Sequence, residues 1–593
     1  MEKLMLQSLT FHKQKNLFNG VNQRFTPIIA VVFLAIALLI PQCINIGGVS
    51  VDYYYMLKDG GYLLDHPWSF PKSNVFSYIP GQKILFQQWG YMVLAAFLTR
   101  TFGNAIGTIL LVDLSVALFV ISFTWFFRLR KIPMSLSFLF AVLLEVIEPY
   151  HGVRPELLTI ALLMLQICGL EQFCNVGEKV ETLPFFRAKK WRWLLFLPFM
   201  TVLEMNLHGS MWIMHFVVVL PYLVQWLFHR RFHRQQYPRW YGIFLFLGMV
   251  SMIPCLFLNP YGIDGILYLP RSMKYLNQYG GCISELRSVT MPKQIGLIFF
   301  SPWVRVMSGV LLLTVFTVLS IEWNECEAIK QLVACFGRIV PRSELKVHSI
   351  ERKKLHIGDF CMILGLTVLA WTKVRQTMWM DIAFAFLIAW SSELLRSKGS
   401  ELMERHKVSF LGMDRRSIPL KTVGRTFKFE KSNNKLSFLV MALSALVLVT
   451  NTYTTNLNAT FHPKDSIITP IKAVRWLNAH GKSKASILCC HDFGSYLQYK
   501  GFRVAMDSRP ECYSKAIGGR SVAENIVPLY DMKSYHIRNA DAYYHKITTL
   551  YRADYAIAYD RSDIFSYLIK NDPNYHAVVK GKGYILYECE ASH

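Results

Sequence analysis

Apolar stretches long enough to cross a lipid bilayer recur along the first three quarters of the chain, and they restrict its possible folds more than any other feature. A bilayer core of about 30 Å needs roughly 20 apolar residues in a helix. The chain of 593 residues is therefore predicted to be a polytopic α-helical membrane protein. We predict about 11 spans, at 26–44, 104–127, 133–150, 155–172, 193–207, 211–228, 241–258, 300–320, 356–373, 378–395 and 436–453.

Lys and Arg cluster in alternate loops between these spans, and this asymmetry predicts the orientation. Basic clusters occupy 128–131, 179–192, 229–239, 338–354 and 396–435, whereas the intervening loops hold fewer cations. Because basic loops stay in the cytoplasm, the N-terminus is predicted to be cytoplasmic in a multi-pass plasma-membrane protein. The formal net charge of +25 then reflects loops lying on anionic lipid, and no nucleic-acid-binding motif is present.

The end of the chain differs in character from the rest. We predict a transmembrane domain at 1–453, with a large first outer loop at 45–103, and a small extracytoplasmic α/β domain at 454–593. The segments "ASILCC", "FRVAMD", "ADYAIAY", "HAVVKG" and "GYILYEC" are typical of short strands, and helical segments separate some of them. The 12 cysteines show no CxxC spacing, so they predict no metal or redox site. Whether a divalent metal is required stays open.

Ionisable and polar residues gather in the predicted outer turns. Such groups near a span cost a few kcal/mol unless they face water or one another. We therefore expect one outward-facing cavity, although each residue taken alone could be a helix cap, a snorkelling side chain or part of a local ion pair. The residues are Glu148, His151, Arg154, Glu204, His208, Asn259, Tyr261, Glu285, Arg287 and Arg375.

The first outer loop begins "VDYYYMLKDGGYLLDHPW" and adds two acids to this set. Asp59 follows Asp52 by seven residues, so both are expected on one helical face. The tyrosines Tyr54 and Tyr55 could stack on a sugar or lie in an interfacial aromatic belt. In the C-terminal segment, Asp507 and Arg509 follow a predicted strand, where open sheets tend to bind ligands. Solvation of a loop would explain them equally well.

Several motifs occur along the chain in an order that resembles the GT-C superfamily of membrane glycosyltransferases, specifically bacterial members with an Asp motif in the first loop. They are "DYYYMLKDG", "PKSNVFSY", "QQWGYMVL", "VRPELL", "NLHGS", "NPYG" and "GSYLQYKGFRVAMDSRPECY". The chain departs from the pattern of that group at Met56, Asn74 and Gln88, which replace a His, an Asp and a Glu. Tyr54 and Tyr55 replace its pair of aromatic residues.

The resemblance implies an inverting transfer of sugar from a polyprenyl-phosphate donor to a glycan, lipid or protein acceptor of the cell envelope, at the outer membrane face. Asp52 would be the general base, assisted by Asp59. Arg154, His151, His208 and Arg375 would bind the donor phosphate. The substrate-binding residues would be Tyr54, Tyr55, Glu148, Glu204, Asn259, Tyr261, Glu285, Arg287, Asp507 and Arg509.

Two alternatives remain open at this stage. The departures from the motif favour a non-catalytic relative that binds a glycan or lipid, or that scaffolds envelope assembly. A transporter is the other alternative, although the chain shows no internal repeat and its polar groups gather on one face instead of at mid-depth.

Overall fold

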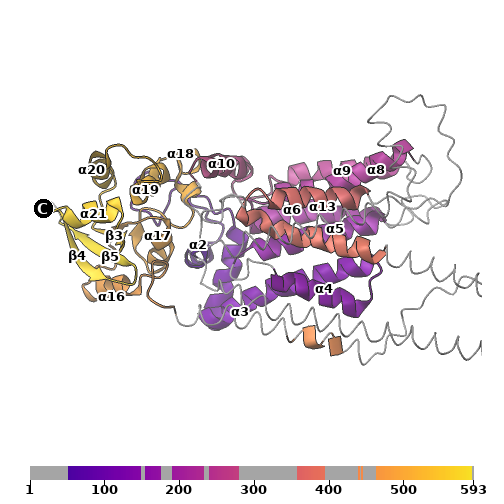
Figure 1. The fold of residues 1–593 in the computed structure, drawn as a ribbon, viewed down its shortest axis with the longest axis horizontal. Coiled ribbons are helices and arrows are strands. Elements are labelled where there is room, and N and C mark those ends of the chain that lie inside the picture. Colours follow the sequence, from indigo (N-terminus) through magenta and orange to yellow (C-terminus); the bar gives the residue numbers. More distant parts are fainter. Residues whose placement is uncertain are drawn as a thin grey trace, which may run out of the picture.

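A computed structural model of the protein describes residues 51–147, 154–174, 190–232, 239–279, 357–393, 439–440, 442–444, 446 and 463–590. A helix bundle forms one end of this structure and an α/β unit forms the other, with α2 (Asp52–Asp65) between them (Figure 1). The predicted spans 26–44 and 300–320 lie outside the described residues, as does most of 436–453.

The other predicted spans coincide with helical segments of the bundle. These segments are α3 (Trp89–Leu129), α4 (Met134–Ile147), α5 (Glu156–Cys174), the 3-10 helix η1 (Lys190–Leu195), α6 (Phe196–Leu207), α7 (Ile213–Val217), α8 (Leu220–Phe232), α9 (Arg239–Cys255), α13 (Ile357–Ala370) and helical residues 380–393. The long α3 consists of two helices joined at Gly103. Glycine can adopt the φ of 83° found at this residue because glycine has no Cβ. Only the part after Gly103 was predicted as a span.

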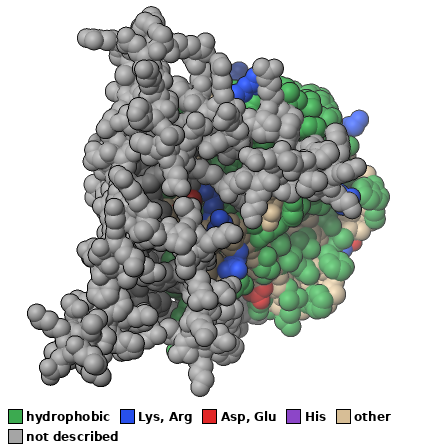
Figure 2. All heavy atoms as spheres, turned by 90° about the vertical axis from the view of Figure 1, so that its right-hand side faces the viewer, with side chains coloured by type: hydrophobic (Ala, Val, Ile, Leu, Met, Phe, Trp, Pro, Cys, Tyr) green, Lys and Arg blue, Asp and Glu red, His purple; other side chains and the backbone are tan. Residues whose placement is uncertain are grey.

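Two helices among the described residues, α3 and α5, are long and apolar enough to cross a membrane. The shorter α9 exposes apolar side chains along one stripe, at Ile243, Phe246, Leu247, Val250 and Ile253. Water does not favour such a stripe, whereas lipid does. Figure 2 views the bundle end, and hydrophobic side chains dominate the described surface seen there, with only scattered charges.

The α/β unit contains a five-stranded mixed sheet in the order β2-β1-β3-β5-β4. The strands β1, β2 and β3 are parallel, whereas β5 is antiparallel to both β3 and β4. Four of the five lie within the segments where strands were predicted, and β4 begins one residue before its segment. The five strands are β1 (Ser486–Leu488), β2 (Arg503–Val504), β3 (Tyr555–Tyr559), β4 (Tyr575–Lys580) and β5 (Tyr584–Cys589).

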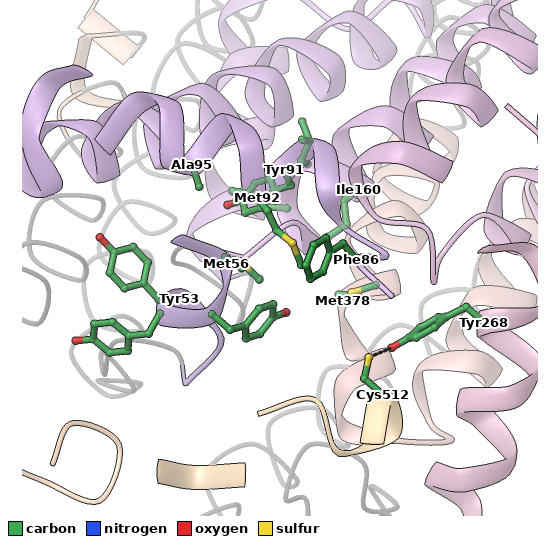
Figure 3. Packing of buried hydrophobic residues seen from close by; sticks show 14 of the residues in the cluster. Tyr53, Met56, Phe86, Tyr91, Met92, Ala95, Ile160, Tyr268, Met378 and Cys512 are labelled. Atoms are coloured by element: carbon green, nitrogen blue, oxygen red, sulfur yellow. Dashed lines mark hydrogen bonds between the residues drawn. The ribbon is translucent and has the colours of Figure 1, made fainter. Parts of the chain in front are cut away.

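Helices surround this sheet, and η7 and α18 face the bundle. They are α16 (Ile471–Ala479), α17 (His491–Tyr499), the 3-10 helix η7 (Pro510–Tyr513), α18 (Lys515–Gly518), α19 (Val522–Tyr530), α20 (Ala540–Leu550) and α21 (Ile564–Asn571). Tyr268 of α10 (Ile263–Tyr279) contacts Cys512 of η7 through a hydrogen bond of 3.8 Å (Figure 3).

The first loop connects the two parts of the molecule. A Cβ on Gly60 of α2 would lie 1.9 Å from the carbonyl oxygen of Met92, so the glycine allows α2 to pack against α3. Beyond α2, the Val504 amide of the edge strand β2 donates to the Phe76 carbonyl at 3.1 Å. The first loop thereby covers a sheet edge that would otherwise offer unpaired backbone groups.

Candidate functional site

Asp52 is the first residue of α2, where its carboxylate interacts favourably with the helix dipole. Its Oδ2 lies 3.5 Å from Nη2 of Arg154, and its Oδ1 accepts a hydrogen bond of 2.6 Å from the Ser508 hydroxyl. The Asp52 side chain remains 22% exposed. The carboxylate is thus oriented by two neighbours and still accessible, which are two requirements of a general base.

Arg375 forms the second cationic position of the site. It lies in the 3-10 helix η5 (Val374–Trp379), and its Nη2 contacts Oε1 of Glu156 at 2.5 Å. Glu156 begins α5, two residues after Arg154, and is almost fully buried. Since Glu156 interacts electrostatically with both arginines, it connects them into one group of charges.

A second carboxylate enters this group from the α/β unit. Glu511 of η7 accepts a hydrogen bond of 2.8 Å from the Tyr268 hydroxyl. Burial raises the pKa of Glu511, the nearby Arg375 opposes that rise and Asp52 adds to it. The sequence reasoning missed Glu511. Its position directly after the Asp507 to Arg509 stretch was the available signal, but the contact with α10 was not visible in the sequence.

The predicted pair of Glu204 and His208 lies at the end of α6, deep in the bundle. The Thr159 hydroxyl donates to Glu204 Oε1 at 2.7 Å and lies 2.8 Å from His208 Nδ1. The only hydrogen of the Thr159 hydroxyl is donated to Glu204. The bond between Thr159 and His208 must therefore be donated by His208, and we assign the ring hydrogen of His208 to Nδ1. Its Nε2 is buried and has no hydrogen-bond partner in the described part of the chain, and the ring interacts electrostatically with Glu156.

A further histidine joins this pair, and the sequence reasoning did not single it out. His215 of α7 places Nε2 3.5 Å from Glu204 Oε2, while its Nδ1 bonds Gln166 of α5 at 2.5 Å. Neither His215 nor Gln166 exposes any surface. The buried Glu204 carboxylate thus has partners on both of its oxygens, which is the usual condition for an acid inside a bundle.

Asp59 lies on the same face of α2 as Asp52, as predicted, but in a different environment. It is fully buried, its Oδ2 lies 2.7 Å from Nη2 of Arg509, and its Oδ1 accepts from Gln498 at 2.8 Å. Burial raises the pKa of the Asp59 carboxyl, and the Arg509 guanidinium offsets part of that rise. Because Asp59 is fully buried, unlike the partly exposed Asp52, it is better suited to joining α2 to the α/β unit than to assisting a base.

Asp507 and Arg509 also differ from their expected substrate-binding role. They follow β2, as predicted, but Arg509 is paired with Asp507 at 2.5 Å and both are buried. The Arg509 guanidinium lies 3.9 Å from the centre of the Tyr55 ring. These contacts occupy the two side chains within the interface between α2 and the α/β unit.

The tyrosines of α2 are buried, which fits neither an aromatic belt nor a sugar platform. Tyr54 packs edge-on against Tyr496 of α17, with ring centres 4.8 Å apart. Tyr55 donates to Gln88 Oε1 at 3.1 Å. Figure 3 shows how α2 side chains such as Met56 lie close to Met92 of α3. Tyr54 and Tyr55 therefore stabilise the junction of α2, α17 and the start of α3.

Asn259 and Tyr261 shape the turn between α9 and α10. Asn259 Oδ1 accepts from the Tyr261 amide at 2.9 Å, and its Nδ2 donates to the Leu256 carbonyl at 2.7 Å. The Tyr261 hydroxyl accepts from the Phe86 amide at 3.0 Å. Four other predicted site residues, Glu148, His151, Glu285 and Arg287, lie outside the described residues.

No three His, Cys, Asp or Glu side chains within the described segments lie close enough together to hold a metal ion. The arrangement that the structure does show is an acid at the start of α2, two arginines linked by Glu156, and a second acid from η7. This combination can accept a proton and stabilise a phosphate in one place.

Comparison with known proteins gives matches only at the level of structure. No family model and no curated protein sequence matches the chain. Among solved structures, it is similar to ArnT from Cupriavidus metallidurans in the apo state, with 12% identity, 95% of this chain and 98% of that chain covered, and a TM-score of 0.47. The same protein bound to undecaprenyl phosphate gives 11% identity, coverage of 95% and 98%, and a TM-score of 0.38.

The apo oligosaccharyltransferase of Archaeoglobus fulgidus is also similar. It shares 11% identity over 89% of this chain and 69% of that chain, with a TM-score of 0.44. At these identities and scores the likeness is one of general arrangement, and the roles of individual residues rest on the contacts described above.

Proposed function

We propose that this chain is a membrane glycosyltransferase that transfers a sugar from a polyprenyl-phosphate donor to a hydroxyl of a cell-envelope glycan, lipid or protein. The observation that supports it most is the geometry at Asp52. A carboxylate that is partly exposed lies 3.5 Å from Arg154, while Glu156 links Arg154 electrostatically to Arg375. The group unites a proton acceptor with cations suited to a phosphate.

The proposed chemistry is a single displacement. Asp52 takes the proton of the acceptor hydroxyl while the oxygen forms a bond to the anomeric carbon of the sugar. The bond from that carbon to the phosphate oxygen breaks, and the polyprenyl phosphate leaves with the electron pair. A guanidinium has five N–H donors, so Arg154 and Arg375 can contact a protein carboxylate and a phosphate oxygen together. Attack opposite the leaving group inverts the anomeric carbon.

The bilayer supplies the donor in this proposal. α3 and α5 are long and apolar enough to span it, and the apolar stripe of α9 is suited to lipid. The N-terminus is proposed to be cytoplasmic, with the α/β unit and Asp52 on the outer side of the plasma membrane.

The departures from the family motif do not remove any group from this cluster. Met56 is buried, Gln88 accepts from Tyr55, and Asn74 donates to Tyr513 at 3.0 Å. These positions lie inside the protein, and Gln88 and Asn74 have hydrogen-bond partners of their own. The substitutions therefore support the non-catalytic alternative less than the sequence alone suggested.

The decisive test compares the full-length wild type with Asp52→Asn, using a panel of undecaprenyl-phosphate sugars labelled in the sugar. We expect undecaprenyl phosphate to be released by the wild type, and the substitution to slow release by roughly 10²–10⁴-fold. Asp65→Asn is the matched control, since Asp65 ends the same helix and pairs with Arg100 at an exposed position. Binding without turnover in the wild type, or solute uptake into vesicles, would contradict the proposal.

A further inference from the structure

Two of the three acids of α2 are held by three consecutive residues of the α/β unit. Arg509 contacts Asp59, Ser508 contacts Asp52, and Asp507 fixes Arg509. Seven residues of α-helix rise about 10.5 Å, whereas adjacent residues of an extended chain are only about 3.3 Å apart. The longer Arg509 side chain covers the difference, so that adjacent residues reach both acids.

The Ser508 backbone is itself anchored, so its hydroxyl has a defined position. The Ser508 amide donates to the Ser495 hydroxyl of α17 at 3.0 Å. The backbone of the next residue is held as well, because the Arg509 amide donates to Asp507 Oδ1 at 2.9 Å. A hydroxyl held in this way orients the carboxylate that it contacts, instead of following it.

We propose that Ser508 is a positioning residue for Asp52, and that the α/β unit therefore completes the active site of the bundle. This inference rests on the proposed function. The Ser508 hydroxyl donates to Asp52 Oδ1, while Arg154 lies near Oδ2, so the rotation of the carboxylate about its own bond is fixed from two sides. The Asp52 oxygen that accepts the proton then faces the acceptor in a defined direction.

The substitution Ser508→Ala removes the hydroxyl and leaves the amide that binds Ser495 intact. In the full-length protein, we expect kcat to fall roughly 10–100-fold while KM for the undecaprenyl-phosphate sugar changes little. Ser508→Thr restores a hydroxyl at the same position and should recover most of the lost turnover. Ser486→Ala is the matched control, because the Ser486 hydroxyl donates to Asp554 at 2.8 Å, at the opposite end of the sheet.

A thermal double-substitution cycle tests the contact without turnover. We expect the Tm decreases of Ser508→Ala and Asp52→Asn not to add in the double variant, since each substitution breaks the same bond. If the wild type turns over and Ser508→Ala equals Ser486→Ala, the inference is overturned and the proposed function stands. If the wild type shows no turnover, the proposed function fails. The positioning role of Ser508 then fails with it, and coupled Tm values would leave only a structural contact.

Discussion

Asp52 and Glu511 illustrate how two carboxyl groups in one site acquire different properties. Asp52 is partly exposed, accepts a hydrogen bond from Ser508 and lies beside Arg154. Burial raises the pKa of Glu511, and the charge of Asp52 adds to the rise, whereas a backbone hydrogen bond, the Tyr268 hydroxyl and the charge of Arg375 oppose it. Two carboxyl groups in such different surroundings are a common arrangement in sites that carry out acid and base chemistry.

The substitution Glu511→Gln should leave the acidic limb of the pH–rate profile close to its wild-type position. Because the pKa of Glu511 is raised, its carboxyl is neutral at the acidic end of the profile, and the neutral glutamine amide replaces it there without a change of charge. We expect a shift of no more than about 0.3 pH unit. Arg154 and Arg375 face the same site and should limit the shift. The measurement is the pH dependence of kcat/KM for undecaprenyl phosphate release.

Glu588→Gln is the control for this substitution. Glu588 accepts from the Tyr555 hydroxyl at 2.8 Å, as Glu511 accepts from Tyr268 at 2.8 Å, but it lies on β5. The control should leave the profile of the wild type unchanged. A shift to lower pH well beyond that of Glu588→Gln would show that Glu511 is ionised at the acidic end of the profile, which would contradict its raised pKa.

At the scale of elements, the position of α2 depends on close packing against its neighbours. Gly60 allows the helix to contact the α3 backbone at Met92, and Tyr54 and Tyr55 fill the other side toward α17 and Arg509. The backbone is equally close at Gly494 of α17, where an added Cβ would lie 1.8 Å from the carbonyl oxygen of Met506. These approaches fix the distance between the start of α2 and the residues that follow β2, and therefore the geometry at Asp52.

Asp465 links α16 to the C-terminal sheet through hydrogen bonds, and the stability of this region should depend on pH. The Asp465 carboxylate accepts from the Tyr584 hydroxyl at 2.6 Å and from the amides of Lys472 and Lys582. Partial burial alone would raise the pKa of Asp465, but these hydrogen bonds outweigh it and the pKa is lowered. The stabilisation is therefore present above about pH 4 and is lost as pH falls through the folded-state pKa.

We expect Asp465→Asn to lower the free energy of opening of α16 by about 1–2 kcal/mol at neutral pH. This difference from the wild type should shrink below about pH 4. Hydrogen exchange of residues 471–479, corrected for the intrinsic pH dependence, measures it. Asp541→Asn should cost less than about 0.5 kcal/mol, since Asp541 is exposed. A difference that stayed constant down to pH 3 would be inconsistent with the lowered pKa.

At the scale of the whole molecule, a buried ion pair joins the helix bundle to the α/β unit. The Asp59–Arg509 pair is hidden from solvent, and Gln498 and Asp507 complete its hydrogen bonds. Substitution of one partner leaves an uncompensated buried charge, which typically costs about 3–5 kcal/mol. The relative placement of the two parts thus depends on charges that come from positions 450 residues apart.

Arg509→Met should therefore destabilise the junction strongly, because it leaves Asp59 and Asp507 buried without their cation. Asp59→Asn should cost less, since Arg509 keeps Asp507 as a partner. Thermal unfolding and hydrogen exchange in α2 and α17 measure both. Arg561→Met is the control, as its pair with Asp563 is exposed and worth about 0–1 kcal/mol. An effect of Arg509→Met no larger than that of Arg561→Met would contradict the proposed junction.

A second buried charge cluster stabilises the opposite end of the bundle, and the sequence reasoning did not predict it. Arg130 at the end of α3 contacts Glu171 of α5 at 2.7 Å and Asp359 of α13 at 2.8 Å. Its guanidinium also lies about 5.4 Å from the Phe386 ring. In the sequence, Arg130 counted only as one cation of a loop predicted to be cytoplasmic. A count of loop charges does not show which residues those charges pair with.

The sequence by itself determined the positions of most helices and strands, since apolar length and alternating burial are local properties of the chain. It also identified Asp52, Arg154, Arg375, Glu204 and His208 as polar groups that should gather. The tertiary structure alone decided which of these groups touch. Asp59 and the tyrosines became buried contacts, and Ser508 and Glu511 reached the site, because pairing between distant segments depends on packing that no local pattern encodes.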